Sequence, residues 1–225
     1  MRAPISIVIP TLNAGDSLPA CLGSLSEGLQ AGLIRELVIS DGGSTDGTLS
    51  IAQQAGARVV TGAASRGGQL VRGTQAAEGD WLLVLHADTR LAEGWSGAVI
   101  TALSQPGAYH FRLAFDVAGS MPTWVACWAN LRSRLFRLPY GDQGLLIDRK
   151  TLEAVGGYPD LPLMEDVALA RRLGRVLRPL PATAITSAEK YQRQGWLRRG
   201  ARNLTTLARY FAGADPETLA RSYRR

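Results

Sequence analysis

A histidine and an aspartate follow an apolar run in the segment LVLHADTRL at residues 83–91. Residues 82–85 have no polar side chain and indicate a buried strand, so His86 and Asp88 stand at its carboxyl end. Positions two apart on a strand face the same way, which directs both groups to one spot beyond the sheet edge. Open α/β sheets bind ligands at that edge.

Two earlier apolar segments also end in polar residues. VIPTLNAG ends in Thr11 and Asn13, and LVISDGG ends in Asp41 with two glycines behind it. If these strands are parallel, Asp41 can accept hydrogen bonds from a base or ribose, and the glycines let a ligand approach the backbone. The alternative is a helix N-cap turn, for which Ser44 and Asp46 suffice.

The first hundred residues alternate between patterns typical of strands and of helices. Alternation with short glycine-rich joints implies a parallel sheet with right-handed crossovers. The sequence therefore predicts an α/β fold with a mostly parallel central sheet and helices on both faces. We expect strands at 5–10, 36–41, 57–62 and 80–88, and helices at 17–29, 44–56 and 67–79.

After about residue 108 the order changes. Residues 108–117 alternate like a half-exposed strand, in which we expect His110 to be structural. A loop and strand follow at 141–149, a helix at 165–174, and then an arginine-rich helical segment. In the helix predicted over 124–136, one face carries four large side chains that we expect to meet the core, although they also suit an interfacial helix: Trp124, Trp128, Leu131 and Leu135.

The net charge of +6 lies in the C-terminal segment, residues 189–225, which carries nine Lys and Arg against three Asp and Glu. Residues 1–188 carry sixteen of each kind and form one predicted domain. A basic segment suits an anionic membrane surface, an anionic substrate or nucleic acid, but simple solvation is its commoner role. No nucleic-acid motif is present, so nucleic acid is the least favoured partner.

Cysteine usage and the apolar runs predict a cytoplasmic protein. Cys21 and Cys127 have no metal-ligand spacing, and no apolar run approaches the ~18 residues of a membrane-spanning helix. Met1 and Arg2 lead directly into the first strand, without a leader pattern. Peripheral contact at the inner membrane face remains open for the C-terminal segment. The sequence does not indicate an oligomeric state.

Two enzyme classes have little support. No G-x-G-x-x-G follows the first strand, which disfavours dinucleotide binding. In a haloacid-dehalogenase-type phosphatase the nucleophilic aspartate would fall on His86.

Six motifs give the chain a resemblance to family 2 glycosyltransferases over nearly its whole length. SIVIPTLN, VISDGGSTDGT, RGGQLVRG, LHADT, YGDQG and GGYPDLPLMED occur in the family's order. RGGQ, PYGDQG and the pattern NLTTLARYFAG…PETLARSY are most similar to the radical-SAM/selenodomain-associated transferases. The resemblance implies a GT-A (Rossmann-like) fold, a nucleoside-diphosphate sugar donor of UDP type, a hydroxyl acceptor, and Mg²⁺ or Mn²⁺. It divides the domain into a nucleotide-binding half, 1–105, and an acceptor and catalytic half, 106–188.

The resemblance also assigns residues to the donor. Asp88 matches the second acidic position of the family's metal-binding D-x-D motif, whereas His86 replaces the first. An imidazole is a poor ligand for Mg²⁺ although acceptable to Mn²⁺, so we interpret His86 as binding the donor. The nucleotide-sugar site implied by the resemblance comprises Pro10, Thr11, Asn13, Asp41, Gly42, Arg66, Gln69, His86 and Ala87.

Asp166 matches the aspartate of the family's acidic pair, the position of the catalytic base, and Glu165 stands beside it. Two acids in a first helical turn also suit the helix dipole without any catalysis. Gly141, Asp142 and Gln143 match the acceptor loop, but they would also make an ordinary turn. In the C-terminal segment, QRQGW departs from the subgroup's arginine-arginine-tryptophan pattern, which leaves the role of that segment in the site open.

These residues predict an inverting glycosyltransferase with Asp166 as base and a metal at Asp88. One alternative is a protein that binds nucleotide sugars without turnover. Another is a sugar-phosphate nucleotidyltransferase, which usually needs a glycine-rich loop with a basic residue after the first strand. PTLNAGDS has no such residue.

Overall fold

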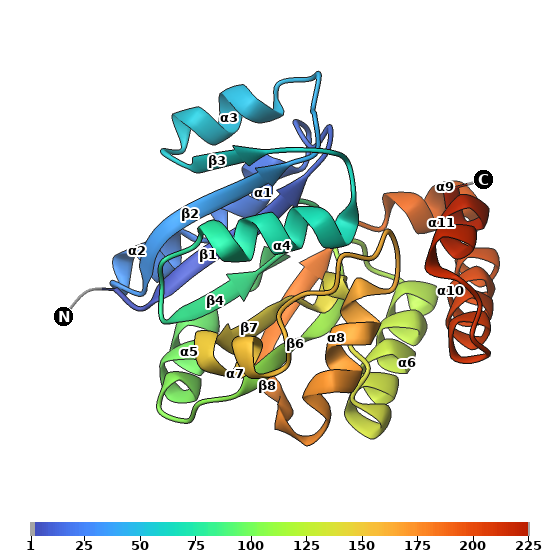
Figure 1. The fold of residues 1–225 in the computed structure, drawn as a ribbon. Helices are drawn as coiled ribbons and strands as arrows, with labels where there is room; N and C mark the ends of the chain where they lie inside the picture. The colour runs from blue at the N-terminus through green and yellow to red at the C-terminus, as the bar shows by residue number, and fades with distance from the viewer. Residues whose placement is uncertain (1–2, 225) are drawn as a thin grey trace.

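The computed structural model describes residues 3–224, whose eight strands form one sheet in the order β3-β2-β1-β4-β7-β6-β8-β5 (Figure 1). Four neighbouring strands are parallel: β1 (Ile5–Thr11), β2 (Ile34–Asp41), β3 (Arg58–Thr61) and β4 (Trp81–Val84). The helices that connect them are α1 (Leu18–Gly23), α2 (Ser26–Gln30), α3 (Thr48–Gln54) and α4 (Arg66–Ala76).

The second half extends the same sheet. β7 (Leu145–Asp148) is antiparallel to β4 and to β6 (Ala108–Phe115), whereas β6 is parallel to β8 (Leu177–Thr186). The short strand β5 (Thr89–Leu91) closes the edge antiparallel to β8. The helices of the second half are α5 (Trp95–Leu103), α6 (Ser120–Phe136), α7 (Arg149–Ala154) and α8 (Glu165–Leu173). Two single 3₁₀ turns accompany them, η1 (Gly141–Gln143) and η2 (Gly174–Val176). The predicted α/β fold, mostly parallel and covered on both faces, is confirmed.

Alternation along the strands divides the core into two layers. Ile5, Ile7 and Ile9 of β1 face helices α1, α3 and α5, whereas Val8 faces the other side, where α4, α7 and α8 pack. All four side chains are fully buried. Because β1 is covered on both faces, its sequence is apolar almost throughout, as expected for a parallel strand inside a sheet.

Three helices form the C-terminal segment: α9 (Glu189–Gln194), α10 (Trp196–Phe211) and α11 (Pro216–Arg224). Leu207 of α10 and Leu219 of α11 are buried against Met164 and Val167 at the start of α8. The segment therefore packs on the domain beside α8. No helix among the described residues is both long and apolar enough to cross a membrane.

Two predicted elements of the first half differ from the prediction. The helix predicted over 17–29 is two short helices, and Leu29 is exposed, because the chain turns after Ser24. Ser17 does not cap the first of them, since its hydroxyl donates to the Ala14 carbonyl instead. Strand β4 ends at Val84, so His86 and Asp88 lie in the turn that follows.

The prediction that Trp124, Trp128, Leu131 and Leu135 face the core was wrong. Their exposed fractions are 60%, 48%, 47% and 62%. The buried face of α6 carries small side chains instead, including Ala126, Ala129 and Ser133, which let the helix approach β6 closely. His110 is buried in β6, with Nδ1 within 3.1 Å of the Phe111 carbonyl oxygen, which confirms its structural role.

Strand β8 was not predicted, because Pro179 and Pro181 argue against a central strand. The pairing with β6 slips between His110 and Arg112, where β8 has extra residues, and the prolines fall at this irregularity. A bulge tolerates proline because its backbone N–H groups are outside the regular ladder.

Candidate active site

A pocket of about 100 Å³, here called the main pocket, lies beyond the carboxyl end of β4. The turn after β4, the loop into η1, the start of α8 and the C-terminal segment bound it, together with the start of α4 and the ends of β6 and β8. The predicted residues His86, Asp88 and Asp166 all line it. Residues separated by up to 80 positions therefore meet at the sheet edge expected for a ligand.

His86 packs directly against the loop. A Cβ atom on Gly141 would lie 2.3 Å from Nε2 of His86, so only glycine fits at this position. Burial, and then the charge of Arg66, lower the pKa of His86 to about 4. The imidazole is therefore neutral at pH 7 and can donate or accept a hydrogen bond, or bind a metal, without adding positive charge.

Asp88 is paired with a lysine of the C-terminal segment. The Lys190 ammonium lies 2.9 Å from Oδ2 of Asp88, and the two side chains are 54% and 28% exposed. Burial is the largest single effect on the Asp88 carboxylate and disfavours its charged form. The charge and hydrogen bond of Lys190, together with the other neighbouring charges, outweigh burial, so the pKa of Asp88 is lower than usual. The carboxylate is thus ionised and available to a cation that can displace the ammonium.

The donor atoms around Asp88 decide how a metal fits. No group of three His, Cys, Asp or Glu side chains suited to a metal occurs among residues 3–224. Asp142 also lines the main pocket, and its buried Oδ1 has no hydrogen-bond partner among the described residues. Mg²⁺ is commonly held by one or two carboxylates together with substrate phosphates. This donor set therefore fits a divalent cation that binds together with a diphosphate.

Asp166 is held by two backbone donors. Oδ2 accepts from the Gly141 N–H at 2.7 Å, and Oδ1 accepts from the Val167 N–H at 2.7 Å. Met164, with φ of 66°, turns the chain into α8 just before the acidic pair. The bond from Gly141 joins α8 to the loop at Gly141, which packs against His86. The position of Asp166 and the shape of the pocket are therefore coupled.

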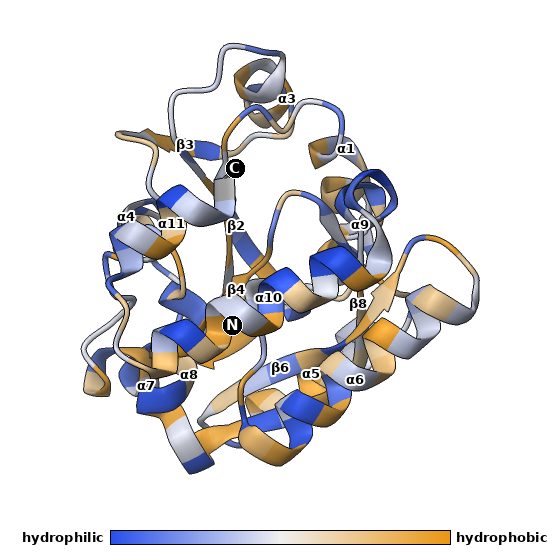
Figure 2. Ribbon diagram, turned by 90° about the vertical axis from the view of Figure 1, so that its right-hand side faces the viewer, coloured by the Kyte–Doolittle hydropathy of each residue, from blue (hydrophilic) through white to orange (hydrophobic). Residues whose placement is uncertain are grey.

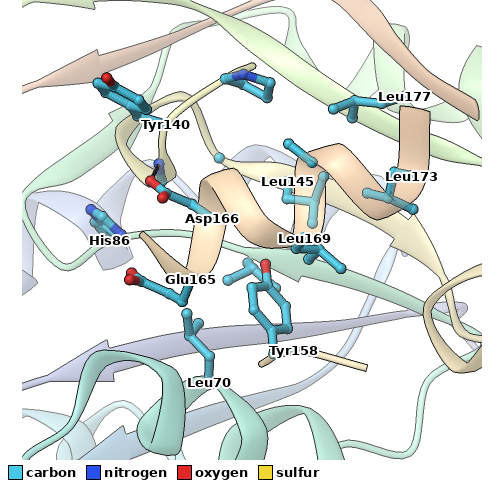
Figure 3. Close-up of a pocket in the computed structure, with 15 residues that line it drawn as sticks. Leu70, His86, Tyr140, Leu145, Tyr158, Glu165, Asp166, Leu169, Leu173 and Leu177 are labelled. Carbon is cyan, nitrogen blue, oxygen red and sulfur yellow. Dashed lines mark hydrogen bonds between the residues drawn. The ribbon is translucent and has the colours of Figure 1, made fainter. Parts of the chain in front are cut away.

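Glu165 and Asp166 leave the start of α8 with their carboxylates at separate places, as Figure 3 shows. Only 1% of Glu165 is exposed, and its Oε2 has no hydrogen-bond partner among the described residues. Burial first, and the charge of Asp166 second, raise the pKa of Glu165 to about 7. It borders a smaller cavity of about 30 Å³ between α8 and the sheet, whose walls include Leu70, Leu145 and Leu169.

The raised pKa of Glu165 predicts a pH-dependent stability. Between pH 4.5 and 7 the folded protein binds more protons than the unfolded chain, so the free energy of unfolding falls as pH rises through this window. Glu165→Gln removes this contribution. Denaturant titrations at pH 5 and pH 8 measure the free energy of unfolding of both proteins. The value for the variant minus that for wild type should be about 1 to 3 kcal/mol larger at pH 8 than at pH 5. If the two proteins differ in free energy of unfolding by the same amount at every pH, the Glu165 carboxyl is not buried and unpaired as described.

Most residues predicted to bind the nucleotide organise the strand ends instead of lining the main pocket. Asp41 is fully buried and accepts from the Thr11 and Ser44 hydroxyls and from the Gly43 and Ser44 N–H groups, at 2.5 to 2.8 Å. Gln69 donates to the carbonyls of Thr11 and Ser40 at 2.7 and 3.1 Å.

Of the nine residues predicted to bind the nucleotide, two line the main pocket and seven do not. Asn13 has φ of 49° and accepts from the Thr45 N–H at 2.9 Å. Arg66 and His86 line the main pocket. Those that do not line it are Pro10, Thr11, Asn13, Asp41, Gly42, Gln69 and Ala87. Their contact with a nucleotide remains a prediction.

Of the three residues predicted for the acceptor loop, two line the main pocket and the third is buried behind it. Gly141 and Asp142 line the main pocket. Gln143 is fully buried, where it accepts from the Ser133 hydroxyl at 2.6 Å and donates to the Phe111 carbonyl at 3.1 Å. It fixes the loop to α6 and β6.

One wall of the main pocket was missed by sequence reasoning. Arg199 donates to the Tyr223 hydroxyl at 2.5 Å, Tyr223 donates to Asn203 at 2.9 Å, and Asn203 donates to the Tyr191 hydroxyl at 3.0 Å. All four line the pocket. The available signal was the spacing of Arg199 and Asn203, four residues apart on one helical face.

Comparisons with known proteins agree with this fold. Residues 6–146 match the family described as Glycosyl transferase family 2. A PGL/p-HBAD biosynthesis glycosyltransferase of Mycobacterium tuberculosis is 42% identical over an alignment of 110 residues, and the match covers 45% of this chain and 42% of that protein. An uncharacterised glycosyltransferase of Mycobacterium bovis is 29% identical over 171 residues, 69% of this chain and 75% of that protein. The chain thus matches less than half the length of the first relative.

Solved structures show the same architecture. Glucosyl-3-phosphoglycerate synthase from Mycobacterium tuberculosis, in complex with Mn²⁺, UDP and glucosyl-3-phosphoglycerate, superposes with a TM-score of 0.57 at 23% identity. The match covers 82% of this chain and 70% of that one. The same enzyme with Mg²⁺ and UDP gives a TM-score of 0.59. This likeness establishes the GT-A fold, while the match to the family over residues 6–146 establishes membership. The chain belongs to glycosyl transferase family 2.

Proposed function

We propose that the protein is an inverting glycosyltransferase that moves a sugar from a nucleoside-diphosphate sugar, of UDP type, to a hydroxyl group. The observation that carries the proposal is the convergence of Asp166, Asp88 and Lys190 on one pocket. They supply a base, a carboxylate for a metal and a cation within one cavity. The fold is that of an enzyme crystallised with Mn²⁺ and UDP, which supports the donor class.

Asp166 acts as the base. The acceptor hydroxyl must lose its proton as it attacks the anomeric carbon, and a carboxylate within hydrogen-bond reach can take that proton. The N–H groups of Gly141 and Val167 hold the Asp166 carboxylate in place. Attack on the face opposite the leaving diphosphate inverts the anomeric centre in a single displacement.

The leaving diphosphate needs positive charge. Asp88 would hold a divalent cation, which neutralises the charge that develops as the diphosphate leaves. Arg66 and Lys190 line the same pocket and add two cations of the chain itself. With Asp88 on a metal, the Lys190 ammonium would be free to bind a phosphate oxygen. Neutral His86 then serves as a hydrogen-bonding group for the donor.

The test is calorimetry with a panel of nucleoside-diphosphate sugars, with and without Mn²⁺. We expect a UDP sugar to bind with a dissociation constant that is lower in Mn²⁺, because the donor set around Asp88 is completed only by the diphosphate. Mn²⁺ alone should bind weakly. No binding by any member of the panel, in either condition, would refute the proposed donor class.

A further inference from the structure

Four large apolar side chains of α6 point away from the core. Trp124, Trp128, Leu131 and Leu135 are spaced four, three and four residues apart, which places them in one stripe along the helix. Each is about half exposed or more. Single exposed apolar residues are ordinary, but a continuous stripe with two tryptophans marks a surface that contacts something.

A second stripe runs along α10. Leu197, Leu204 and Phe211 are spaced seven residues apart and are 69%, 54% and 47% exposed. Ala201 and Ala208 lie between them on the same side of the helix and are also exposed. Helices α6 and α10 pack against each other and are seen together on the face shown in Figure 2. We call the exposed faces of these two helices the docking surface.

The charge of the docking surface has a single sign. Helices α6 and α10 contain no Asp or Glu, whereas they carry six arginines. Among residues 3–223, no carboxylate lies within 4.0 Å of any of these guanidinium groups. Arg134, Arg198 and Arg209 are exposed beside the apolar stripes. The surface therefore combines large apolar side chains with positive charge that the protein itself does not neutralise.

This combination distinguishes between two occupants. In a two-fold dimer the same surface meets itself, so arginines without acidic partners would be set against arginines. An anionic lipid surface offers phosphates for the arginines and an apolar layer for the tryptophans and leucines. Amphipathic helices that lie in a membrane interface have this composition, with Arg or Lys beside Trp, Phe and Leu.

We propose that the docking surface binds an anionic lipid bilayer, with the two stripes in the headgroup boundary and the arginines on lipid phosphates. Helix α10 also contributes Arg199 and Asn203 to the main pocket. Docking through α10 therefore brings the pocket next to the bilayer surface. The proposal rests on α6 and α10 alone and does not depend on the chemistry proposed for Asp166.

The test is sedimentation of the whole chain with vesicles of phosphatidylcholine, either alone or mixed with phosphatidylglycerol, at low salt. Wild type should sediment with the anionic vesicles and far less with neutral ones. Trp124→Ser with Trp128→Ser should lower the vesicle partition coefficient by about tenfold or more, equivalent to about 1.4 kcal/mol. Arg198→Gln with Arg209→Gln should weaken the preference for anionic lipid, because each basic residue near the surface adds to the attraction.

A matched control replaces exposed apolar residues outside the docking surface. Leu29 of α2 and Ile100 of α5 are 61% and 52% exposed. Their double serine variant should sediment like wild type, and circular dichroism should show all variants folded. Equal sedimentation of the tryptophan variant and wild type would overturn the proposal. So would ultracentrifugation showing a dimer that the tryptophan substitutions dissociate, since a second copy would then cover the surface.

Discussion

Asp166→Asn should lower the rate of sugar transfer by a factor of about 10² or more, with donor affinity close to that of wild type. The amide cannot take the proton of the acceptor hydroxyl. Asparagine retains one acceptor oxygen, so it can keep the bond from the Gly141 N–H or that from the Val167 N–H, but not both. We therefore expect a modest loss of stability beside a large loss of rate. Nucleoside diphosphate release measures the rate of transfer, and calorimetry measures donor affinity.

Glu165→Gln is the matched control for Asp166→Asn. It makes the same chemical change at the adjacent position, but Glu165 does not line the main pocket. Its transfer rate should stay within a few-fold of wild type. Full activity in Asp166→Asn, or equal losses in both variants, would return Asp166 to a structural role at the start of α8.

Breaking the Asp88–Lys190 pair from its two ends should have opposite effects on Mn²⁺ binding. Asp88→Asn removes the carboxylate proposed to hold the metal, so the Mn²⁺-dependent part of donor affinity should be lost. Lys190→Ala removes the ammonium that lies 2.9 Å from Asp88, so Mn²⁺ should bind more tightly in the absence of donor. The same variant should bind UDP less tightly without metal, because one cation of the pocket is missing.

Calorimetry with Mn²⁺ alone and with UDP alone separates these effects without any turnover. Lys190→Ala and Asp88→Asn share the loss of the ion pair, so a shared change in stability reports the pair itself. Equal Mn²⁺ affinity in wild type and both variants would show that Asp88 is not a metal ligand.

The first half of the fold could be predicted because local and global signals agree there. Strands β1, β2 and β4 are apolar runs bounded by glycine and polar residues, and each helix between them has apolar residues at helical spacing. The second half could not be predicted as well, because β8 contains two prolines that only its bulge explains. On α6 the spacing indicated one apolar face correctly. It did not indicate that the small residues face β6 and the large ones face outward.

The site could be predicted in part for a similar reason. Motif order brought His86, Asp88 and Asp166 together correctly at one pocket. Polarity at a strand end does not distinguish a ligand contact from an internal hydrogen bond, and Asp41 and Gln69 make internal bonds. Tyr223 reaches the pocket through the packing of α10 and α11 on α8, which depends on contacts distant in sequence. Lys190 lies in α9, just after β8, a strand that was not predicted.

The central claim is that the main pocket catalyses a single displacement at the anomeric carbon. Slow transfer to water tests it most directly, because no acceptor has to be known. Wild type with Mn²⁺ and the tightest-binding α-linked donor of the panel is followed by NMR, which distinguishes the anomers of the released sugar before they interconvert. We predict that the β anomer appears first and that its release is lost in Asp166→Asn. Initial release of the α anomer, or release that Asp166→Asn leaves unchanged, would contradict the account.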